Sequence, residues 1–470
     1  MKKLYFITGS QDLYGEETLK QVAADSAEMV KFLNGKLKDT VKIVCTSTVR
    51  NAEEAEDICL KATCDKDCVG VITWMHTFSP AKMWIRGLQA LKKPMLHLHT
   101  QANEKLPYKT IDMDFMNLNQ SAHGDREFGF ICTRLGIKRE VVVGFYRHED
   151  VIEKIRAFAQ VAIALNFSHG MRVAMFGSNM RDVAVTDGDR VESEIRYGWN
   201  VNYYGIGDMV EIANAVTEQE IDEKMSEYDK KYELATKDIK AVREQAKYHV
   251  ALEKFLKQER ISAFTDNFQD LHGLTQLPGL SVQDLMSKGV GFGAEGDYKT
   301  GALMAVLCKM AEGRKGGTAF MEDYTYDLTA GSEKELASHM LEVSPAFAAS
   351  KPKIEVHPLG IGGKQPPARL VFDGVEGDGI AVCMVDMGTH FRLICAKIRL
   401  IKQPEAMPKL PVARLMWELV PDFKTGAAAW IYAGGAHHAV VSTALKVEDI
   451  KLFAKLTDTE LIVIDESTVI

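Results

Sequence analysis

The feature of this sequence that most constrains its fold is a change of pattern near residue 316. Before it, short runs rich in β-branched and aromatic residues alternate with segments whose apolar residues recur every three or four positions. After it, strand-like runs follow one another directly, as in ARLVFDGVEGDGIAVCMVDMGTHFRLICAKIRLI. Alternation predicts parallel, doubly wound sheets, whereas consecutive strands predict an antiparallel barrel or sandwich.

We therefore predict an α/β protein of three domains, because 470 residues exceed what one hydrophobic core usually supports. Two doubly wound, Rossmann-like α/β domains are expected over residues 1–170 and 171–315, followed by a mostly antiparallel, barrel-like β domain over 316–470. The charged segment 218–259 is typical of a solvated pair of surface helices. The strands expected in the first domain are residues 3–9, 41–47, 68–75, 94–100 and 140–146.

The composition excludes several classes of partner. A net charge of −8, a pI near 6.0 and scattered Lys and Arg residues argue against nucleic-acid binding. No run approaches the roughly 18 apolar residues of a membrane span, and the first apolar run is too short for a signal peptide. Eight cysteines without a C-x-x-C pair indicate reduced thiols in a cytoplasmic protein.

The segment GVGFGAEGDYK (289–299) contains the G-x-G-x-x-G spacing of dinucleotide-binding loops. A nicotinamide-dependent dehydrogenase is therefore one alternative, but Glu295 and Asp297 would repel a diphosphate at a helix N-terminus. The two acidic residues could instead cap the following helix, which carries an apolar stripe. A third interpretation is that the glycines let the backbone present Glu295 to a metal or a substrate.

The segment TAFMEDYTYDL (318–328) is expected to be a strand, in which side chains alternate between the two faces. Phe320, Glu322, Tyr324 and Tyr326 would then share an aromatic face. A buried carboxylate on such a face is costly unless it is paired, hydrogen-bonded or bound to a metal. An ordinary ion pair and a metal ligand both remain open for Glu322.

Three histidines lie in further apolar runs. In SHMLEV (338–343), alternation would put His339 on an apolar face, either as a satisfied core residue or as a ligand. In WIYAGGAHHAVVS (430–442), an extended strand would send His437 and His438 to opposite faces, and periodicity does not choose between them. Carboxylates and imidazoles together form a mixed O/N set that suits Mn²⁺ or a similar cation. An open site of this kind suits proton transfer beside a polarised carbonyl.

Motifs along essentially the whole chain closely resemble those of the L-arabinose isomerase family. They are GSQDLYG (9–15), WMHTFSPAKMW (74–84), NLNQSAHGDREFGF (117–130), EGDYKT (295–300), FMEDYTY (320–326), SHMLEV (338–343), LGIGGK (359–364) and AGGAHH (433–438). The resemblance implies conversion of L-arabinose to L-ribulose, with slower conversion of D-galactose to D-tagatose. The reaction would proceed by metal-assisted proton transfer through an enediolate.

The resemblance also implies roles for individual residues. The metal ligands would be Glu295, Glu322, His339 and His438, and the two glutamates would also be the catalytic acid/base pair. The sugar-binding residues would be Gln11, Tyr14, Phe78, His123, Phe268, Ile361 and His437. One Mn²⁺ per subunit is expected, with Co²⁺ or Mg²⁺ as substitutes. A homo-oligomer is also expected, either a hexamer, which is favoured, or a tetramer, with each sugar pocket completed between subunits.

Two other functions compete with this interpretation. An isomerase of another aldose, such as a fucose-type sugar, would use the same kind of site. A non-catalytic sugar-binding protein built from two doubly wound domains would explain the first 300 residues, but it would leave Glu322, His339 and His438 without a role.

Overall fold

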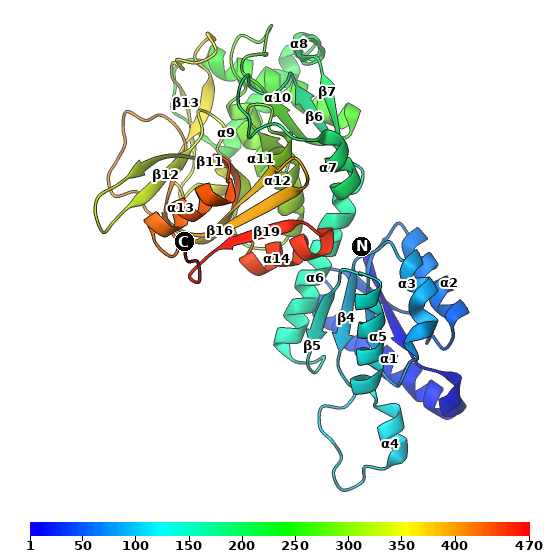
Figure 1. Cartoon of the computed structure of the whole chain (residues 1–470). Coiled ribbons are helices and arrows are strands. Elements are labelled where there is room, and N and C mark those ends of the chain that lie inside the picture. The colour runs from blue at the N-terminus through cyan, green and yellow to red at the C-terminus, as the bar shows by residue number, and fades with distance from the viewer. The chain divides into compact units, whose positions relative to one another are not determined.

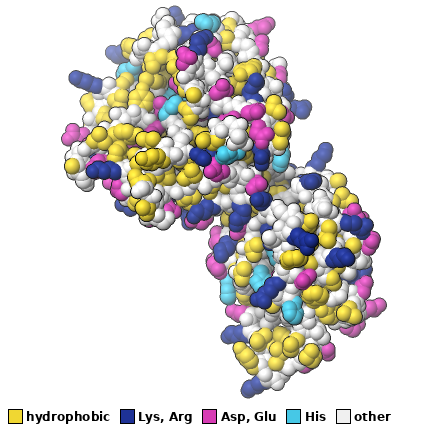
Figure 2. All heavy atoms as spheres, viewed as in Figure 1, with side chains coloured by type: hydrophobic (Ala, Val, Ile, Leu, Met, Phe, Trp, Pro, Cys, Tyr) yellow, Lys and Arg dark blue, Asp and Glu magenta, His cyan; other side chains and the backbone are white.

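The computed structural model describes residues 1–470 and divides the chain into two compact units. The first unit comprises residues 1–166 and 452–458, and the second comprises 167–451 and 459–470. Figure 1 shows the helices and strands of both units, with many of them labelled. No helix combines the length and the apolar character that crossing a bilayer requires. On the face shown in Figure 2, Lys and Arg side chains are interspersed with Asp and Glu.

The first unit contains a five-stranded parallel sheet in the order β2-β1-β3-β4-β5. Its strands match the predicted runs to within a few residues: β1 Lys3–Gly9, β2 Lys42–Cys45, β3 Cys68–Met75, β4 Met95–His99 and β5 Glu140–Val143. Its main helices are α1 Gly15–Leu37, α2 Ala52–Cys64, α3 Ile85–Ala90, α4 Met113–Leu118, α5 Ser121–Arg134 and α6 Glu149–Ser168. In this order, β2 lies on one side of β1, and β3, β4 and β5 lie on the other, so the order of the strands changes direction between β1 and β3. Ligands of doubly wound folds usually bind at this point.

Helices cover both faces of this sheet. Tyr5 and Ile7 on β1 pack with residues of α2, α3 and α5 in one hydrophobic cluster. On the opposite face, the Thr8 hydroxyl lies 2.8 Å from the Ser26 hydroxyl of α1. Burial on both faces explains why β3 reads as a continuous apolar run rather than an alternating one.

The second unit begins with a four-stranded parallel sheet in the order β10-β9-β6-β7. Its strands are β6 Met171–Phe176, β7 Trp199–Tyr204, β9 Ile261–Asp266 and β10 Gly291–Gly293. Its helices are α7 Arg190–Tyr197, α8 Ile206–Asn214, α9 Glu218–Lys231, α10 Ile239–Glu259, α11 Leu280–Ser287 and α12 Tyr298–Met310. The prediction of a solvated helix pair over 218–259 is wrong for α10, because half of its residues are buried, including the hydrogen-bonded Gln245 and His249.

The remainder of the second unit is a closed six-stranded antiparallel barrel, as predicted. The strands follow the order β15-β18-β11-β12-β17-β16, and pairing of β16 with β15 closes the ring. They are β11 Thr318–Asp327, β12 Lys334–Ser338, β15 Gly377–Asp386, β16 Phe391–Ile401, β17 Arg414–Leu419 and β18 His438–Ser442. Strand β19 (Glu460–Ile464) adds to β16 in parallel. A small sheet joins β8 (Glu233–Leu234), β13 (Lys353–Val356) and β14 (Ala368–Val371).

The C-terminal region contains two helices, α13 (Phe423–Ala433) and α14 (Val447–Thr457), and α13 overlaps the start of the segment 430–442 that we expected to be a strand. The apolar WIYA segment therefore ends a helix instead of starting a strand. Asp422 caps the N-terminus of α13 by accepting from the Thr425 amide, and Gly434 ends it in the left-handed region at φ 78°. These caps, rather than the periodicity of the apolar residues, mark the helix.

Helix α12 packs against β9 and β10 of the parallel sheet and also against β11, β15 and β18 of the barrel. It is therefore buried nearly all round, and the single apolar stripe expected for it is only part of its buried surface. A Cβ on Gly291 would overlap the carbonyl oxygen of Gly301 in α12 and would lie 2.8 Å from the Cβ of Ala263. Gly291 and Gly293 of the fingerprint spacing thus serve close packing of a strand on a helix.

We expect Gly291→Ala to lower the Tm of the second unit by about 6–12 °C, because overpacking a tight interior site costs about 3 kcal/mol. Gly207→Ala in α8 is the matched control, since no atom lies within 4 Å of the Cβ that it would add. The measurement is thermal unfolding followed by circular dichroism. Equal Tm values for the two variants would contradict this account of the close packing.

Candidate active site

Four elements of the second unit bring the predicted metal ligands together. Glu295 lies between β10 and α12, Glu322 on β11, His339 just after β12 and His438 at the start of β18. Strand β11 lies between the other two strands, so Glu322 pairs with His438 on one side and with Ser338 on the other. Directly paired residues of an antiparallel sheet project from the same face. The register therefore places Glu322 beside His438, while Ser338, its partner on the other side, directly precedes His339 in the chain.

Each of these histidines is oriented by a carboxylate. His339 Nδ1 lies 2.5 Å from Glu342 Oε2, and His438 Nδ1 lies 3.2 Å from Asp297 Oδ2. In each case the other ring nitrogen is directed into the site. His339 Nε2 is 3.8 Å from Glu322 Oε2, and His438 Nε2 is 4.0 Å from Glu295 Oε2. Metal-binding histidines characteristically have such a carboxylate on the second nitrogen, which sets the tautomer.

The donor set fits a divalent cation. His438 is fully buried, and its Nε2 has no hydrogen-bond partner. Burial lowers the pKa of His438, which favours the neutral imidazole that a metal requires. Burial also disfavours the charged form of His339, but Glu342, Glu322 and Glu295 outweigh it and raise its pKa to about 9. A divalent cation would neutralise this concentration of negative charge.

His437 lies closer to the same site than strand alternation predicted. Its ring centroid is 4.3 Å from that of His438, and its Nε2 is 3.6 Å from Glu295 Oε2. Strand β18 begins only at His438, so His437 belongs to the bend before it, where it lines the barrel interior with Met321 and Asp323 and also approaches Glu295. Ligand-type atoms of Glu295, His437 and His438 lie within 4.8 Å of one another. Burial favours His438 as the ligand, since the His437 side chain is 35% exposed.

Two further predictions, both based on side chains alternating between the faces of a strand, are wrong because the backbone is irregular at those positions. The pairing of β11 with β12 shifts register between Asp323 and Thr325, and this bulge moves Tyr326 to the face of Asp323. Tyr326 therefore lines the barrel interior, whereas Glu322 and Tyr324 line the candidate site. His339 is not on a strand, because β12 ends at Ser338. Its position comes from the following turn and from the bond to Glu342.

A cavity of about 260 Å³ opens onto three of the four predicted metal ligands. Its wall includes Glu295, Glu322 and His339 together with Phe268 and Ile361, two of the three sugar-binding residues predicted for the second unit. Met180, Asp266 and Tyr324 are among the wall residues that sequence reasoning did not assign to the site. Burial and the nearby Glu342 raise the pKa of Asp266 to about 8. Asp266 could have been suspected because it ends a buried parallel strand, where ligands of such sheets bind.

Sequence reasoning also missed the two carboxylates that orient the histidines, although both lie within quoted motifs. Asp297 follows Glu295 by two residues, and Glu342 follows His339 by three. Burial would raise the pKa of Asp297, but Lys299 and His438 outweigh burial and hold it well below its usual range. Asp297 is therefore a carboxylate that only accepts hydrogen bonds.

The four sugar-binding residues predicted for the first unit lie in segments that follow β1 (Gln11 and Tyr14), β3 (Phe78) and β4 (His123, on α5). Gln11 Nε2 donates to the Phe78 carbonyl oxygen at 3.0 Å, and the rings of Phe78 and His123 meet edge to face at 6.4 Å. The Tyr14 hydroxyl donates to Gln120 Oε1 at 3.1 Å. Gln11, Tyr14 and Phe78 are partly exposed, and His123 is exposed.

Comparison with known proteins identifies the family. The models for the L-arabinose isomerase N-terminal, central and C-terminal domains match residues 1–170, 172–313 and 317–460. L-arabinose isomerases of Geobacillus stearothermophilus and Thermotoga sp. are each 50% identical over 99% of this chain, covering 95% and 94% of their own lengths. The enzyme of Halalkalibacterium halodurans is also 50% identical, over 99% of this chain and 94% of its own.

Among solved structures, a periplasmic sugar-binding protein of Legionella pneumophila matches 67% of this chain and 96% of its own at 11% identity and a TM-score of 0.16, which carries no argument about function. The three family models together span nearly the whole chain, and the sequence relatives share half of its residues. The chain belongs to the L-arabinose isomerase family.

Proposed function

We propose that this protein isomerises L-arabinose to L-ribulose, and D-galactose to D-tagatose more slowly, with one Mn²⁺ per subunit and Co²⁺ or Mg²⁺ as substitutes. The cation would be held by Glu295, Glu322, His339 and His438. One observation carries the proposal: two carboxylates and two carboxylate-oriented imidazoles meet beside a cavity, with His438 Nε2 buried and unpartnered. Family membership supplies the substrate class.

The chemistry needs two proton transfers between neighbouring atoms. An aldose and its ketose differ by one proton moved from C2 to C1 and by another moved between their oxygens. A bound divalent cation supplies stabilisation of the negative charge that develops on those oxygens. Glu295 and Glu322 face the cavity, so one carboxylate can take the carbon-bound proton while the other transfers the oxygen-bound proton.

The surroundings of Glu295 keep its carboxylate ionised. The imidazole of His437, 3.6 Å away, is the largest of the effects that hold the pKa of Glu295 below its usual value, and His438 and His339 add to it against burial. The carboxylate is therefore ionised and ready to accept a proton at neutral pH. Phe268, Leu271 and Ile361 form an apolar part of the wall, which limits access of water to the reacting atoms.

We further propose a homo-oligomer, a hexamer rather than a tetramer, in which the first unit of a neighbouring copy completes each sugar pocket. The support is the family resemblance, together with the grouping of Gln11, Phe78 and His123 on one edge of the first unit. A cytoplasmic location is part of this proposal. It is supported by eight cysteines that are all free thiols, as a reducing compartment would keep them.

Metal removal tests the proposed reaction. We expect the metal-stripped protein to form no ketose, and added Mn²⁺ to restore L-ribulose formation from L-arabinose most strongly, because the charge on the sugar oxygens is then neutralised. The measurement is ketose formation over a panel of aldoses that includes D-galactose and L-fucose. Preference for L-fucose would replace the substrate assignment. Sugar binding without turnover in the Mn²⁺-loaded protein would indicate a sugar-binding protein instead.

The two adjacent histidines should respond differently to substitution. His438→Ala removes a proposed ligand, so Mn²⁺ binding and ketose formation should both collapse. His437→Ala should keep bound metal and lose activity by roughly 10–100-fold, the usual effect of a group just outside the ligand set. Metal content and Mn²⁺ titration calorimetry on both variants provide the measurement. If His437→Ala loses the metal while His438→Ala retains it, the ligand assignment is reversed.

Complementation tests the shared pocket. His123→Ala and Glu322→Ala should each be nearly inactive alone, but mixed oligomers should recover part of the activity, because some pockets would combine two intact halves. A mixture of Glu322→Ala and Glu322→Gln is the matched control, since both defects lie in the same half of the pocket. The measurement is ketose formation by oligomers purified through two different tags. Activity in the first mixture no higher than in the control would count against a shared pocket.

A further inference from the structure

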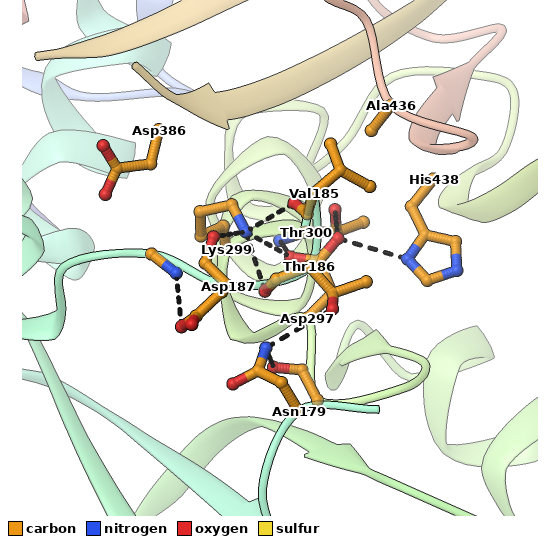
Figure 3. A network of polar contacts seen from close by, with 12 residues as sticks. Asn179, Val185, Thr186, Asp187, Asp297, Lys299, Thr300, Asp386, Ala436 and His438 are labelled. Atoms are coloured by element: carbon orange, nitrogen blue, oxygen red, sulfur yellow. Dashed lines mark hydrogen bonds and ion pairs between the residues drawn. The ribbon is translucent and has the colours of Figure 1, made fainter. Parts of the chain in front are cut away.

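Lys299, in the first turn of α12, is a fully buried cation that the proposed chemistry does not use. Its Nζ donates to the carbonyl oxygens of Val185, Thr186 and Asp187 at 3.2, 2.9 and 2.7 Å, and it pairs with Asp297 Oδ1 at 3.2 Å (Figure 3). A buried ammonium group is tolerated only when it is paired and hydrogen-bonded in this way. Lys299 is thus tied to one carboxylate and to three consecutive backbone carbonyls.

Asp297 connects Lys299 to a proposed metal ligand. It caps α12 by accepting from the Thr300 amide at 3.1 Å and the Thr300 hydroxyl at 2.7 Å, and it also faces His438 Nδ1 at 3.2 Å. Figure 3 shows Asp297 between Lys299 and the His438 ring. Because a carboxylate only accepts hydrogen bonds, its bond to Nδ1 requires the proton on that nitrogen and leaves a lone pair on Nε2.

The three carbonyls belong to the loop between β6 and α7, residues 177–189, which we call the β6–α7 loop. The beginning of this loop holds the backbone around Glu295. The Met180 amide donates to the Glu295 carbonyl oxygen at 2.9 Å, and Asn179 Nδ2 donates to the Gly296 carbonyl oxygen at 3.1 Å. Glu295 needs this support because its φ of 62° lies in the left-handed region, which residues other than glycine seldom adopt.

The end of the loop is fastened to the barrel. The Asp189 amide donates to Asp386 Oδ2 of β15 at 2.7 Å. Between the two ends, Gly188 passes so close to Lys299 that an added Cβ would lie 2.8 Å from the lysine Cδ. The path of the β6–α7 loop is therefore matched to the position of the Lys299 side chain.

We propose that Lys299 is a positioning residue for the metal site, which orients His438 through Asp297 and supports Glu295 through the β6–α7 loop. One ammonium group thereby holds two proposed ligands that come from different parts of the second unit. The inference rests on the proposed function for the nature of the cation. A purely structural lysine would affect the stability of the protein but not the Mn²⁺ affinity of its folded form.

The first test compares Lys299→Met with Lys309→Met. Lys309 lies on the same helix, but its ammonium group pairs only with the exposed Glu312, so it is a matched control. We expect Mn²⁺ binding to the metal-stripped protein, measured by titration calorimetry without sugar, to weaken by roughly 10–100-fold in Lys299→Met. Lys309→Met should bind like the unaltered protein. Unchanged affinity in folded Lys299→Met, verified by circular dichroism, would overturn the proposal.

A double-mutant cycle separates positioning from general damage. Asp297→Asn keeps the shape of the side chain but offers a donor to His438 Nδ1, which would put the ring proton on Nε2 and weaken Mn²⁺ binding. If Lys299 acts through Asp297, adding Lys299→Met to Asp297→Asn should change the affinity by much less than it does alone. Fully additive losses of Mn²⁺ affinity would overturn the connection through Asp297.

If Lys299→Met does not fold, Gly188→Ala tests the positioning role of Lys299 instead. The added methyl group crowds the lysine stem while leaving its charge, at a partly exposed position without positive φ. We expect Mn²⁺ affinity to fall by about 3–10-fold, a fraction of the loss that removal of such a supporting group causes. Normal affinity would overturn the proposal.

If the unaltered protein binds Mn²⁺ but does not isomerise L-arabinose, the proposed function fails, while these binding comparisons still decide the role of Lys299.

Discussion

A buried carboxylate, Asp297, is the constraint on which the second unit depends. Removing an ionised group from water is unfavourable unless partners replace the lost hydration. Asp297 receives these partners from three sources: the first turn of α12, the ammonium group of Lys299 and the imidazole of His438. Since His438 starts a barrel strand, while α12 follows the parallel sheet, this single charge links the two halves of the unit.

The same junction explains the unusual backbone of the site. Helix α12 packs so closely on β10 that glycine is required at Gly291, and the chain then turns sharply into the helix. Glu295 lies in this turn with positive φ, where strain is tolerated because backbone hydrogen bonds from Met180 and between Gly296 and Asp266 hold the chain. The glycine spacing that resembles a nucleotide loop thus serves to present a carboxylate.

The elements of the fold were largely predictable from local patterns. Strands β1 and β3 were found with correct bounds because apolar runs between turn signals are local properties of the chain. Helix α13 was missed, since its apolar residues lack a clear period and its caps, Asp422 and Gly434, were overlooked. Tyr326 was assigned to the wrong face because the β-bulge in β11 depends on pairing with β12, which no spacing within the strand reveals.

By itself, the sequence determined the chemistry available to this protein: carboxylates at Glu295 and Glu322, and imidazoles at His339, His437 and His438, within motifs of one family. Only the tertiary structure decided which nitrogens face the site. His438 and Asp297 are 141 residues apart, and their contact exists because the barrel closes against α12. Spacing along the chain determines which side chains share a face, but the free lone pair of a ring nitrogen depends on partners that folding brings from distant segments.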